Sequence, residues 1–283
     1  MIEVLVVRAF VADGKGGNLA GVVLDDKGLT DEQMHSIAKK LKFSETAFVT
    51  PSTNADYRVR FFSPGGEVDL CGHATIATFF ALKVCQKLSK QSLTQETRAG
   101  TLKVRVLEDG TVFMDQSLPQ FGMKISKNEV ADVLNLSLEC ITNQPQIIST
   151  GLRDIFVEIK DLKELFAMKP NFDGIRQLSE KYDTVGIHAF TKETLDRNST
   201  AHCRNFAPRY GIDEEPATGT SNGALACYLL TNHHVSTKSL IFEQGYQMNS
   251  PSKILVHLET ENKSITRVQV GGTAVIERKV RIE

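Results

Sequence analysis

The chain lacks a strong charge of either sign, and it lacks any long apolar run. Its 283 residues carry a formal net charge of -1 at pH 7, and the pI is near 6.7. This balance gives no electrostatic reason to expect nucleic acid or an anionic membrane as a partner. No apolar run approaches the roughly 20 residues that a helix needs to cross a bilayer. We therefore expect neither nucleic acid nor a membrane among the partners of this protein.

Cysteine is scarce, and its spacing is not that of a disulfide framework or a zinc knot. The five cysteines stand far apart in the chain, at positions 71, 85, 140, 203 and 227. Disulfide scaffolds use even numbers at close, paired spacings, so we expect free thiols in a reducing compartment. The first residues carry an acid early and form a strand pattern instead of a signal peptide. The cytoplasm is the expected location.

One pattern occurs twice in the chain. The stretches are Cys71-Gly-His-Ala-Thr-Ile-Ala and Thr218-Gly-Thr-Ser-Asn-Gly-Ala, each a polar cluster with a glycine that opens an apolar run. Such a run is typical of a buried helix. Arg60-x-Phe-x-Pro precedes the first copy, and Arg204-x-Phe-x-Pro precedes the second. The repeat predicts an ancient duplication, with halves at 1–117 and 128–283 and a linker within 116–127.

Both halves are predicted to have the same order of elements. In the first, Thr30 with Gln33 indicates the start of a helix, and a strand from Phe43 follows it at once. A polar run over 87–98 separates the central helix from later strands. In the second half, a helix over 172–182 and a strand over 185–190 precede the second central helix. Many strands and one long apolar helix per half predict an α+β fold in which a curled sheet wraps around that helix.

Both central helices begin with a glycine, at Gly72 and Gly219. A helix N-terminus offers unpaired N–H groups and the positive end of the helix dipole, and glycine lets a ligand approach the backbone. If the halves face each other, carboxylates or enolate-like oxygens are the natural ligands of a shared cleft. The structural alternative is that these glycines serve only close packing of helix against sheet.

The sequence disfavours two other kinds of site, a serine hydrolase triad and a metal site. Gly219-Thr-Ser-Asn-Gly matches the G-x-S-x-G pattern of hydrolases, but a loop precedes it where that pattern needs a strand. A triad on Ser221 would have to use Glu243 and His257. Metal binding by Cys71 with His73, or by His202 with Cys203, is disfavoured because neither pair has a partner cluster at ligand spacing. We therefore predict no metal.

The motifs as a set resemble those of the phenazine biosynthesis PhzF-like isomerases. The resemblance spans essentially the whole chain in the right order, through Gly17-Asn-x-Ala, Phe43-Ser-Glu-Thr-Ala-Phe-Val, Glu67-Val-Asp-Leu-Cys-Gly-His-Ala-Thr, Arg204-x-Phe-x-Pro with Gly211-Ile, Glu215-Pro-Ala-Thr-Gly-Thr, Gln244-Gly with Pro251-Ser, and Gly271-Gly.

The resemblance implies a diaminopimelate-epimerase-like fold. In this fold two pseudo-symmetric halves, each a barrel-like and mostly antiparallel sheet around a central helix, have the active site between them. It also implies a homodimer without a metal or an organic cofactor. The founding enzyme isomerises trans-2,3-dihydro-3-hydroxyanthranilate by moving a proton with a glutamate that matches Glu45. The implied catalytic residues are Glu45, His73, Glu215 and Thr220, and the implied substrate-binding residues are Asn18, Ser44, Gly72, Thr218 and Gly219.

Departures from the family pattern leave the substrate open. Glu215 stands where the family has Asp, and Thr220 stands where it has Ser. We therefore expect a cofactor-independent isomerase that moves a proton on a small cyclic or unsaturated, amino- or hydroxy-substituted carboxylic acid. The alternatives are a cysteine-dependent epimerase or racemase of the same fold, and a non-catalytic small-molecule-binding protein. Two-thiol racemisation is disfavoured because Thr218 occupies the position opposite Cys71, and the hydroxyl of threonine is far too weak an acid.

Overall fold

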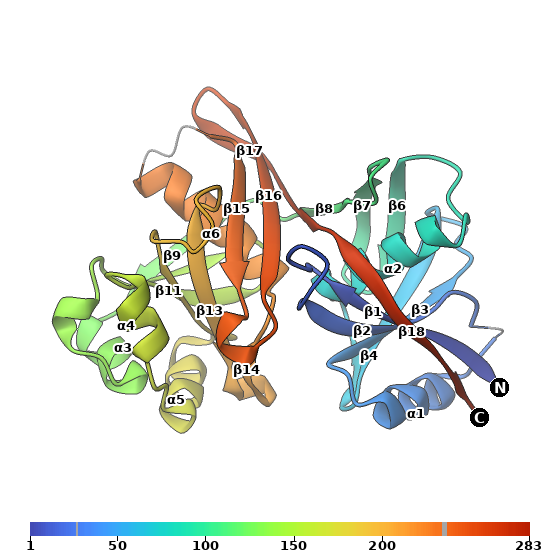
Figure 1. Cartoon of the computed structure of the whole chain (residues 1–283), viewed down its shortest axis with the longest axis horizontal. Coiled ribbons are helices and arrows are strands. Elements are labelled where there is room, and N and C mark those ends of the chain that lie inside the picture. Colours follow the sequence, from blue (N-terminus) through green and yellow to red (C-terminus); the bar gives the residue numbers. More distant parts are fainter. Residues whose placement is uncertain (27, 234–236) are drawn as a thin grey trace. The chain divides into compact units, whose positions relative to one another are not determined.

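The computed structural model describes residues 1–26, 28–233 and 237–283. It is a mixed α+β protein, mostly sheet with a few helices, as predicted (Figure 1). The chain forms two compact units. Unit 1 comprises Met1–Asp115 with Gly271–Glu283, and unit 2 comprises Gln116–Val270. In the part of the chain that the structure describes, no helix is both long and apolar enough to cross a membrane.

The elements of unit 1 surround one buried helix. Its helices are α1 (Asp31–Leu41) and α2 (Gly72–Val84), and its strands are β1 (Ile2–Ala9), β2 (Asn18–Val23), β3 (Glu45–Thr50), β4 (Tyr57–Ser63), β5 (Gly66–Val68), β6 (Ser92–Thr97), β7 (Gly100–Val106), β8 (Val112–Gln116) and β18 (Ala274–Ile282).

Unit 2 contains the central helix α6 and three shorter helices. Its helices are α3 (Lys127–Leu134), α4 (Leu162–Ala167), α5 (Phe172–Tyr182) and α6 (Gly219–Asn232), with 3-10 turns at Leu138–Cys140, Pro208–Tyr210 and Tyr246–Met248. Its strands are β9 (Gln120–Lys124), β10 (Gln146–Ser149), β11 (Arg153–Glu158), β12 (Gly186–Thr191), β13 (Ala201–Ala207), β14 (Ile212–Glu215), β15 (Ser239–Gln244), β16 (Ser252–Glu261) and β17 (Ser264–Gly272).

The division of the chain differs from the expected halves, 1–117 and 128–283, in two places. β18 pairs antiparallel with β1, from Ala9 opposite Ala274 to Ile2 opposite Ile282, so the C-terminal residues belong to unit 1. The expected linker contains β9, which pairs with β10. The side chains of β9 are all exposed, and those of β18 are mostly exposed or half-buried. Neither strand therefore has the continuous apolar pattern of a buried strand.

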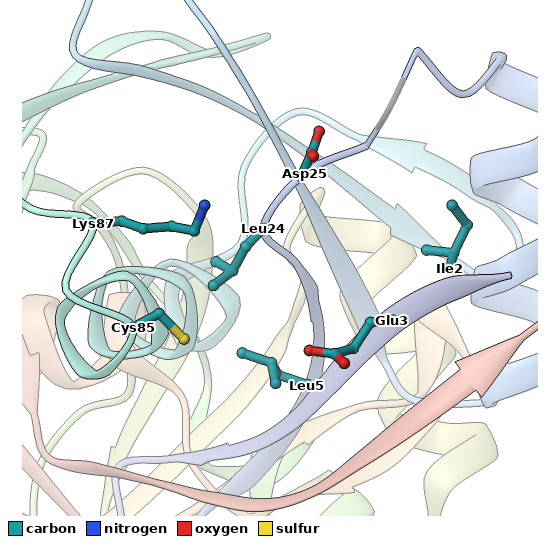
Figure 2. Close-up of a pocket in the computed structure, with 7 residues that line it drawn as sticks. All are labelled: Ile2, Glu3, Leu5, Leu24, Asp25, Cys85 and Lys87. Atoms are coloured by element: carbon teal, nitrogen blue, oxygen red, sulfur yellow. The ribbon is translucent and has the colours of Figure 1, made fainter.

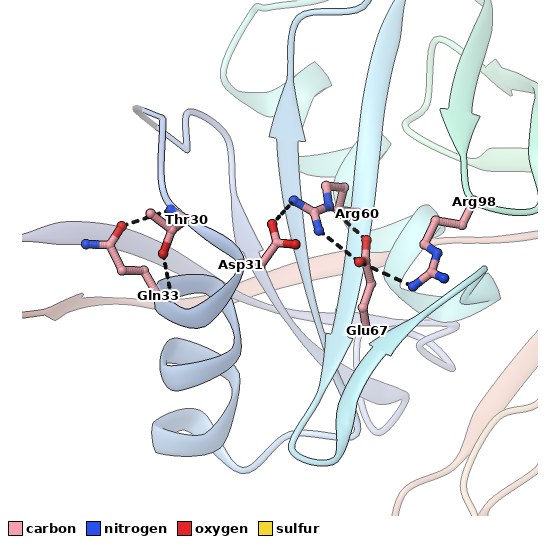
Figure 3. Close-up of polar contacts among 6 residues, drawn as sticks. All are labelled: Thr30, Asp31, Gln33, Arg60, Glu67 and Arg98. Carbon is pink, nitrogen blue, oxygen red and sulfur yellow. Dashed lines mark hydrogen bonds and ion pairs between the residues drawn. The ribbon is translucent and has the colours of Figure 1, made fainter.

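Helix α1 begins and ends as its sequence predicts. Thr30 Oγ1 accepts from the backbone N–H of Gln33, and the backbone N–H of Thr30 donates to Gln33 Oε1 (Figure 3). Its buried face, which includes Met34, packs against a cluster containing Phe48 of β3. The helix ends at Lys42, which adopts a left-handed conformation with φ 57°. Residue 45 therefore opens β3 directly after a helix, as expected.

Helix α2 is buried on almost all sides. Every residue from His73 to Phe79 is buried, and the helix contacts β1, β2, β3, β7 and β18. Figure 1 shows α1 and α2 on opposite sides of the strands β1 to β3. A helix that is apolar all round is stable only inside a core, so the curled sheet of unit 1 forms around α2. In unit 2, α6 is equally buried and contacts β10, β11 and β16.

The two units repeat one topology. The order α1, β3, β4, β5, α2 in unit 1 matches α5, β12, β13, β14, α6 in unit 2. The pairing sense matches as well: β2–β3 and β11–β12 are parallel, β3–β4 and β12–β13 are antiparallel, and β4–β6 and β13–β15 are parallel. This correspondence supports the duplication that the sequence repeat predicts.

The repeated arginine has the same structural role in both units. In unit 1, Arg60 donates from Nε and Nη2 to the two carboxylate oxygens of Glu67, both at 2.8 Å (Figure 3). These hydrogen bonds lower the pKa of Glu67. The guanidinium also lies 5.1 Å from the ring centre of Phe62. A bidentate pair of this kind fixes β4 to β5, the strand that leads into α2.

In unit 2, Arg204 repeats these contacts and adds two. It donates from Nε and Nη2 to Glu214, both at 2.9 Å, and lies 5.0 Å from the ring centre of Phe206. Its Nη1 donates to the carbonyls of Leu165 and Met168, both at 3.1 Å. The pair is more buried than its counterpart, with 8% of the Arg204 side chain exposed against 16% for Arg60.

We predict that Arg204→Met lowers the free energy of unfolding by roughly 3–5 kcal/mol, because it leaves the Glu214 carboxylate, whose side chain is only 13% exposed, without its partner. The control is Arg153→Met, since Arg153 pairs with Asp183 at 3.3 Å while both side chains are largely exposed. An exposed pair of this kind contributes about 0–1 kcal/mol. Urea denaturation measures both variants. Equal, small losses would contradict a stabilising role for the buried pair.

Candidate active site

Three reactive side chains of unit 1 meet at the N-terminus of α2. Glu45 Oε2 lies 3.3 Å from His73 Nε2, and the thiol of Cys71 donates to the same oxygen at 3.4 Å. Cys71 Sγ is also 3.4 Å from His73 Nδ1. His73 is buried, while 17% of the Glu45 side chain is exposed. The carboxylate is therefore held from the protein side and reachable from solvent.

Two more predicted residues orient His73. Ser44 Oγ lies 3.2 Å from Nε2 of the ring, and Asn18 Nδ2 lies 3.3 Å from Nδ1. Burial lowers the pKa of His73, while the charge of Glu45 and a hydrogen bond with the backbone of Leu19 act in the opposite direction. The net effect lowers this pKa, which favours the neutral ring. A neutral imidazole can both donate and accept a hydrogen bond beside Glu45.

Gly72 does not serve close packing. A Cβ built on Gly72 would meet only Met114 Sδ, at an ordinary contact distance of 3.9 Å, among the residues that the structure describes. The structural alternative for this glycine, close packing of helix against sheet, is therefore not supported. The first backbone N–H groups of a helix have no partner within the helix. At α2 they lie next to the cluster of Glu45, Cys71 and His73.

Unit 2 places the other predicted residues at the N-terminus of α6. Glu215 ends β14, and Thr218, the residue before the helix, donates from Oγ1 to Glu215 Oε2 at 3.0 Å. Gly219 and Thr220 form the first turn, where the carbonyl of Thr220 accepts from Thr150 Oγ1 at 3.0 Å. The structure thus brings Glu215, Thr218, Gly219 and Thr220 together within one unit.

Gln244 holds this second set of residues in place, although the sequence motif that contains it did not predict such a role. Its Oε1 accepts from the backbone N–H of Thr218 at 3.3 Å and from Asn222 Nδ2 at 2.8 Å. Its Nε2 donates to the carbonyl of Glu215 at 2.8 Å and to Thr218 Oγ1 at 3.0 Å. One amide thereby fixes the whole turn from β14 to α6. The Gln244-Gly motif does not reveal these contacts, because Gln244 reaches the start of α6 only in the folded chain.

The residues of the hydrolase alternative do not form a catalytic triad. Ser221 lies inside α6, and its hydroxyl donates to Asp154 Oδ2 at 2.5 Å. Glu243 pairs with His202 at 2.7 Å, and His257 contacts Ser239 instead. The residues that a triad on Ser221 would need therefore have other partners.

Comparison with known proteins decides the family. The family model described as phenazine biosynthesis-like protein, PhzC-PhzF, matches residues 7–280. The chain belongs to the phenazine biosynthesis-like family. An uncharacterized isomerase of Clostridium acetobutylicum is 34% identical, covering 95% of this chain and 94% of the relative. The trans-2,3-dihydro-3-hydroxyanthranilate isomerase of Pseudomonas aeruginosa is 28% identical and covers 96% of both chains. This PhzF-family chain is an isomerase.

Solved structures agree with the family and extend the likeness in fold. A PhzF-family protein of Bacillus anthracis has a TM-score of 0.91 and 34% identity, covering 100% of this chain and 99% of that one. A hydroxyproline epimerase of Agrobacterium vitis has a TM-score of 0.60 at 14% identity, covering 99% of this chain and 91% of that one. The second likeness shows a shared fold alone.

One argument against a metal site in this PhzF-family chain, the lack of a third donor near Cys71 and His73, is wrong. The sequence offered no third donor for Cys71 and His73, yet the fold adds Glu45, and donor atoms of all three lie within 4.8 Å of one another. Glu45 is distant in sequence and reaches the helix only through β3. Cys71 is buried, and its thiol contacts both Glu45 and His73.

A hollow elsewhere in unit 1 does not involve these residues. It has a volume of about 210 Å³ and is lined by Ile2, Glu3, Leu5, Leu24, Asp25, Cys85 and Lys87 (Figure 2). Cys85 caps the C-terminus of α2, whereas His73 lies in its first turn. The hollow therefore lies at the end of α2 away from the reactive cluster.

A buried polar network beneath α6 yields a prediction about pH. His188 is fully buried, and Asn205 Nδ2 contacts its Nδ1 at 3.1 Å. Burial lowers the pKa of His188 to about 3, against the opposing effect of Asn222. The unfolded chain takes up a proton below the ordinary value of 6.5 and the native chain does not, so folding stability falls as pH drops from 6.5 to about 3.

We expect the ring resonances of His188 to stay those of neutral imidazole through most of this range. We also expect the stability difference between wild type and His188→Gln to shrink as pH falls. NMR titration and urea midpoints at several pH values measure these two effects. A ring that titrates near 6.5 in the native protein would contradict the prediction.

Proposed function

We propose that this chain moves a proton between two carbons of a small cyclic or unsaturated carboxylic acid that carries an amino or hydroxy group. It does so without a metal or an organic cofactor, and Glu45 is the acid-base residue. The observation that carries this proposal is the contact of Glu45 Oε2 with His73 Nε2 at 3.3 Å, at the N-terminus of α2.

The geometry supports a proton shuttle in three ways. Glu45 stands at the first residue of β3, so its backbone is held by the sheet. Its Oε2 contacts the imidazole of His73 and the thiol of Cys71, which fixes one oxygen. The carboxylate is partly exposed, so a substrate carbon can approach it. General acid-base catalysis needs such a group within hydrogen-bonding reach of the transferred proton.

The first turn of α2 supports a carboxylate as the substrate's anchor. Its N–H groups carry the positive end of the helix dipole, which favours an anion. Gly72 leaves this backbone uncovered by a side chain. Asn18 and Ser44 contact His73 and therefore belong to the same cluster of side chains.

For unit 2 we propose substrate positioning by Glu215 and Thr220, with Gly219 and Thr218. The hydrogen bond from Thr218 orients the Glu215 carboxylate, and Gln244 fixes the turn that carries both. This turn lies at the N-terminus of the helix that repeats α2. The shared cleft, the homodimer and the cytoplasmic location expected from sequence stay predictions.

A cysteine-dependent epimerase is the second candidate, because the thiol of Cys71 contacts Glu45 and His73. At the matching position of unit 2, Thr218 donates its hydroxyl to Glu215. A hydroxyl in that place is a poor substitute for the second thiol of a two-base racemase. A substrate-binding protein without catalysis is the third candidate. The contact between Glu45 and His73 favours catalysis over it.

The first test is proton exchange in D₂O with a panel of amino- or hydroxy-substituted cyclic carboxylic acids. The panel includes trans-2,3-dihydro-3-hydroxyanthranilate, the substrate named for the Pseudomonas relative. We expect wild type to convert at least one acid with deuterium at the newly protonated carbon. Glu45→Gln should bind that acid and lose about 10²- to 10⁴-fold in rate. NMR and mass spectrometry follow both product and label.

The control is Glu3→Gln, because Glu3 pairs with Lys279 at an exposed site of unit 1 and should turn over normally. Cys71→Ala should keep most activity. If Cys71→Ala loses as much rate as Glu45→Gln, the thiol mechanism replaces this proposal. Binding of an acid by wild type without any turnover or label across the panel favours the binding-protein alternative.

The second test addresses unit 2. Thr220→Val removes the hydroxyl while keeping the shape, so we expect weaker binding of the acid identified above, by about 1–3 kcal/mol for a lost polar contact. Thr220→Ser keeps the hydroxyl and should bind normally. Isothermal titration measures both variants. Equal affinities for the Val and Ser variants would remove Thr220 from the proposed site.

A further inference from the structure

Four buried polar side chains form a network beneath the start of α6. The hydroxyl of Ser221 donates to Asp154 Oδ2 at 2.5 Å. Asn205 Nδ2 lies 3.4 Å from Ser221 Oγ and 3.1 Å from His188 Nδ1. Each of these four residues is at most 2% exposed. Asp154, His188 and Asn205 lie in β11, β12 and β13, so the network joins three neighbouring strands to the helix.

Unit 1 has apolar residues at the same four places. When Arg60 is aligned with Arg204 and Gly72 with Gly219, the strand registers and the helix starts match the two sets. The matching pairs are Ala20 with Asp154, Ala47 with His188, Phe61 with Asn205, and Ala74 with Ser221. All four residues of unit 1 are completely buried. The repeated frame therefore forms without polar side chains at these places.

The polar set of unit 2 lowers stability. Burial raises the pKa of Asp154 against the opposing effect of its hydrogen bonds, and burial lowers the pKa of His188. Both shifts mean that these groups lose hydration on folding. Apolar residues at the same places avoid that loss, so stability alone does not explain the polar set. Polar groups kept in a core where apolar ones suffice point to a function.

The strand that carries the acid differs between the units for a steric reason. In unit 1 the first residue of β3 is Glu45, whose carboxylate contacts the first turn of α2. The matching residue of unit 2 is Gly186, which pairs with Asp154, and a Cβ there would lie 1.7 Å from the carbonyl oxygen of Phe206. No side chain can therefore reach α6 from that place. Asp154, on the adjacent strand, reaches Ser221 instead.

We propose that Asp154 is a positioning residue for the substrate. Through Ser221 it holds the first turn of α6 so that Thr220 presents its side chain, and the turn its N–H groups, to the bound acid. This inference rests on the role proposed above for Thr220.

The contact between Asp154 and Ser221 controls the one freedom that the other contacts leave. Gln244 and Thr150 hold backbone groups of the turn, through the N–H of Thr218 and the carbonyl of Thr220. Successive side chains of a helix point about 100° apart. Fixing Ser221 against β11 therefore also fixes the direction in which the next side chain, that of Thr220, points. A misplacement of about 1 Å at such a site can cost a large factor in rate.

Three variants separate positioning from stability. Asp154→Ala leaves the Ser221 hydroxyl buried without its acceptor and should lower the urea midpoint. The double variant Asp154→Ala/Ser221→Ala removes both partners and gives unit 2 the alanine pair of unit 1. Joint removal of this kind is nearly neutral for stability, so the midpoint should recover. Asp154→Asn keeps an acceptor oxygen in the same shape and is the conservative variant.

Amide hydrogen exchange, followed by NMR, tests the turn without a substrate. The N–H of Asn222 donates to the carbonyl of Thr218 at 3.2 Å and closes the first turn. We expect its exchange to accelerate at least about tenfold in the double variant and to be rescued in Asp154→Asn. The matched control is Ser179→Ala, which removes an equally buried hydroxyl from α5 and should leave this amide unchanged. Unchanged exchange of Asn222 in the folded double variant overturns the proposal.

Kinetics with the acid converted in the first test of the proposed function give the second result. The double variant should raise KM at least about tenfold and change kcat less, because Glu45 is untouched, while Asp154→Asn should rescue KM. A KM that returns to the wild-type value together with the urea midpoint makes the network structural only and overturns the proposal.

Failure of this inference differs from failure of the proposed function. If Thr220→Val binds the acid normally, the proposed role of unit 2 fails. If Thr220→Val weakens binding and the double variant does not, only the role of Asp154 fails. Exchange of Asn222 decides whether Asp154 holds the turn even if no acid of the panel is converted.

Discussion

The bidentate pairing of an arginine with a glutamate is the interaction on which both units depend. Arg60 with Glu67, and Arg204 with Glu214, each tie the strand before the central helix to the strand that leads into it. The side chains of each central helix are mostly apolar, and only a few polar ones, such as Thr75 in α2 and Ser221 in α6, form hydrogen bonds with other elements. Its first turn can carry reactive groups at fixed positions because the charged pair sets where the chain enters the helix.

The same scaffold carries different chemistry at its two helix N-termini. Unit 1 presents a thiol and an imidazole beside Glu45, whereas unit 2 presents hydroxyls beside Glu215. Beneath the helices the units differ too. Phe61 of β4 occupies the place of Asn205 in β13, and only the second forms a polar network with His188 and Ser221. Duplication has therefore kept the frame while the residues at each helix start diverged.

Cys71 and Thr218 occupy matching positions in the two units. The thiol of Cys71 donates to Glu45, and the hydroxyl of Thr218 donates to Glu215 by the same kind of hydrogen bond.

The sequence by itself determined the repeat, α1 with its capping residues, the two central helices and the junction at Glu45. These features depend on local patterns: apolar periodicity, capping side chains, and a motif that occurs twice. The sequence did not reveal β6 within the polar run at 87–98, β9 within the expected linker, or the return of β18 to β1. These strands have few buried side chains, and backbone pairing with distant partners places them.

Only the tertiary structure decided which side chains meet. Glu45 and Cys71 are far apart in sequence and come together because β3 lies against the helix that follows Cys71. Gln244 reaches the turn before α6 in the same way, from a strand that follows the helix. Contacts of this kind leave no periodic signal, since each depends on how two separate elements pack. The family resemblance therefore identified Glu45 and His73 as candidates, and packing showed that Glu45, Cys71 and His73 form one cluster.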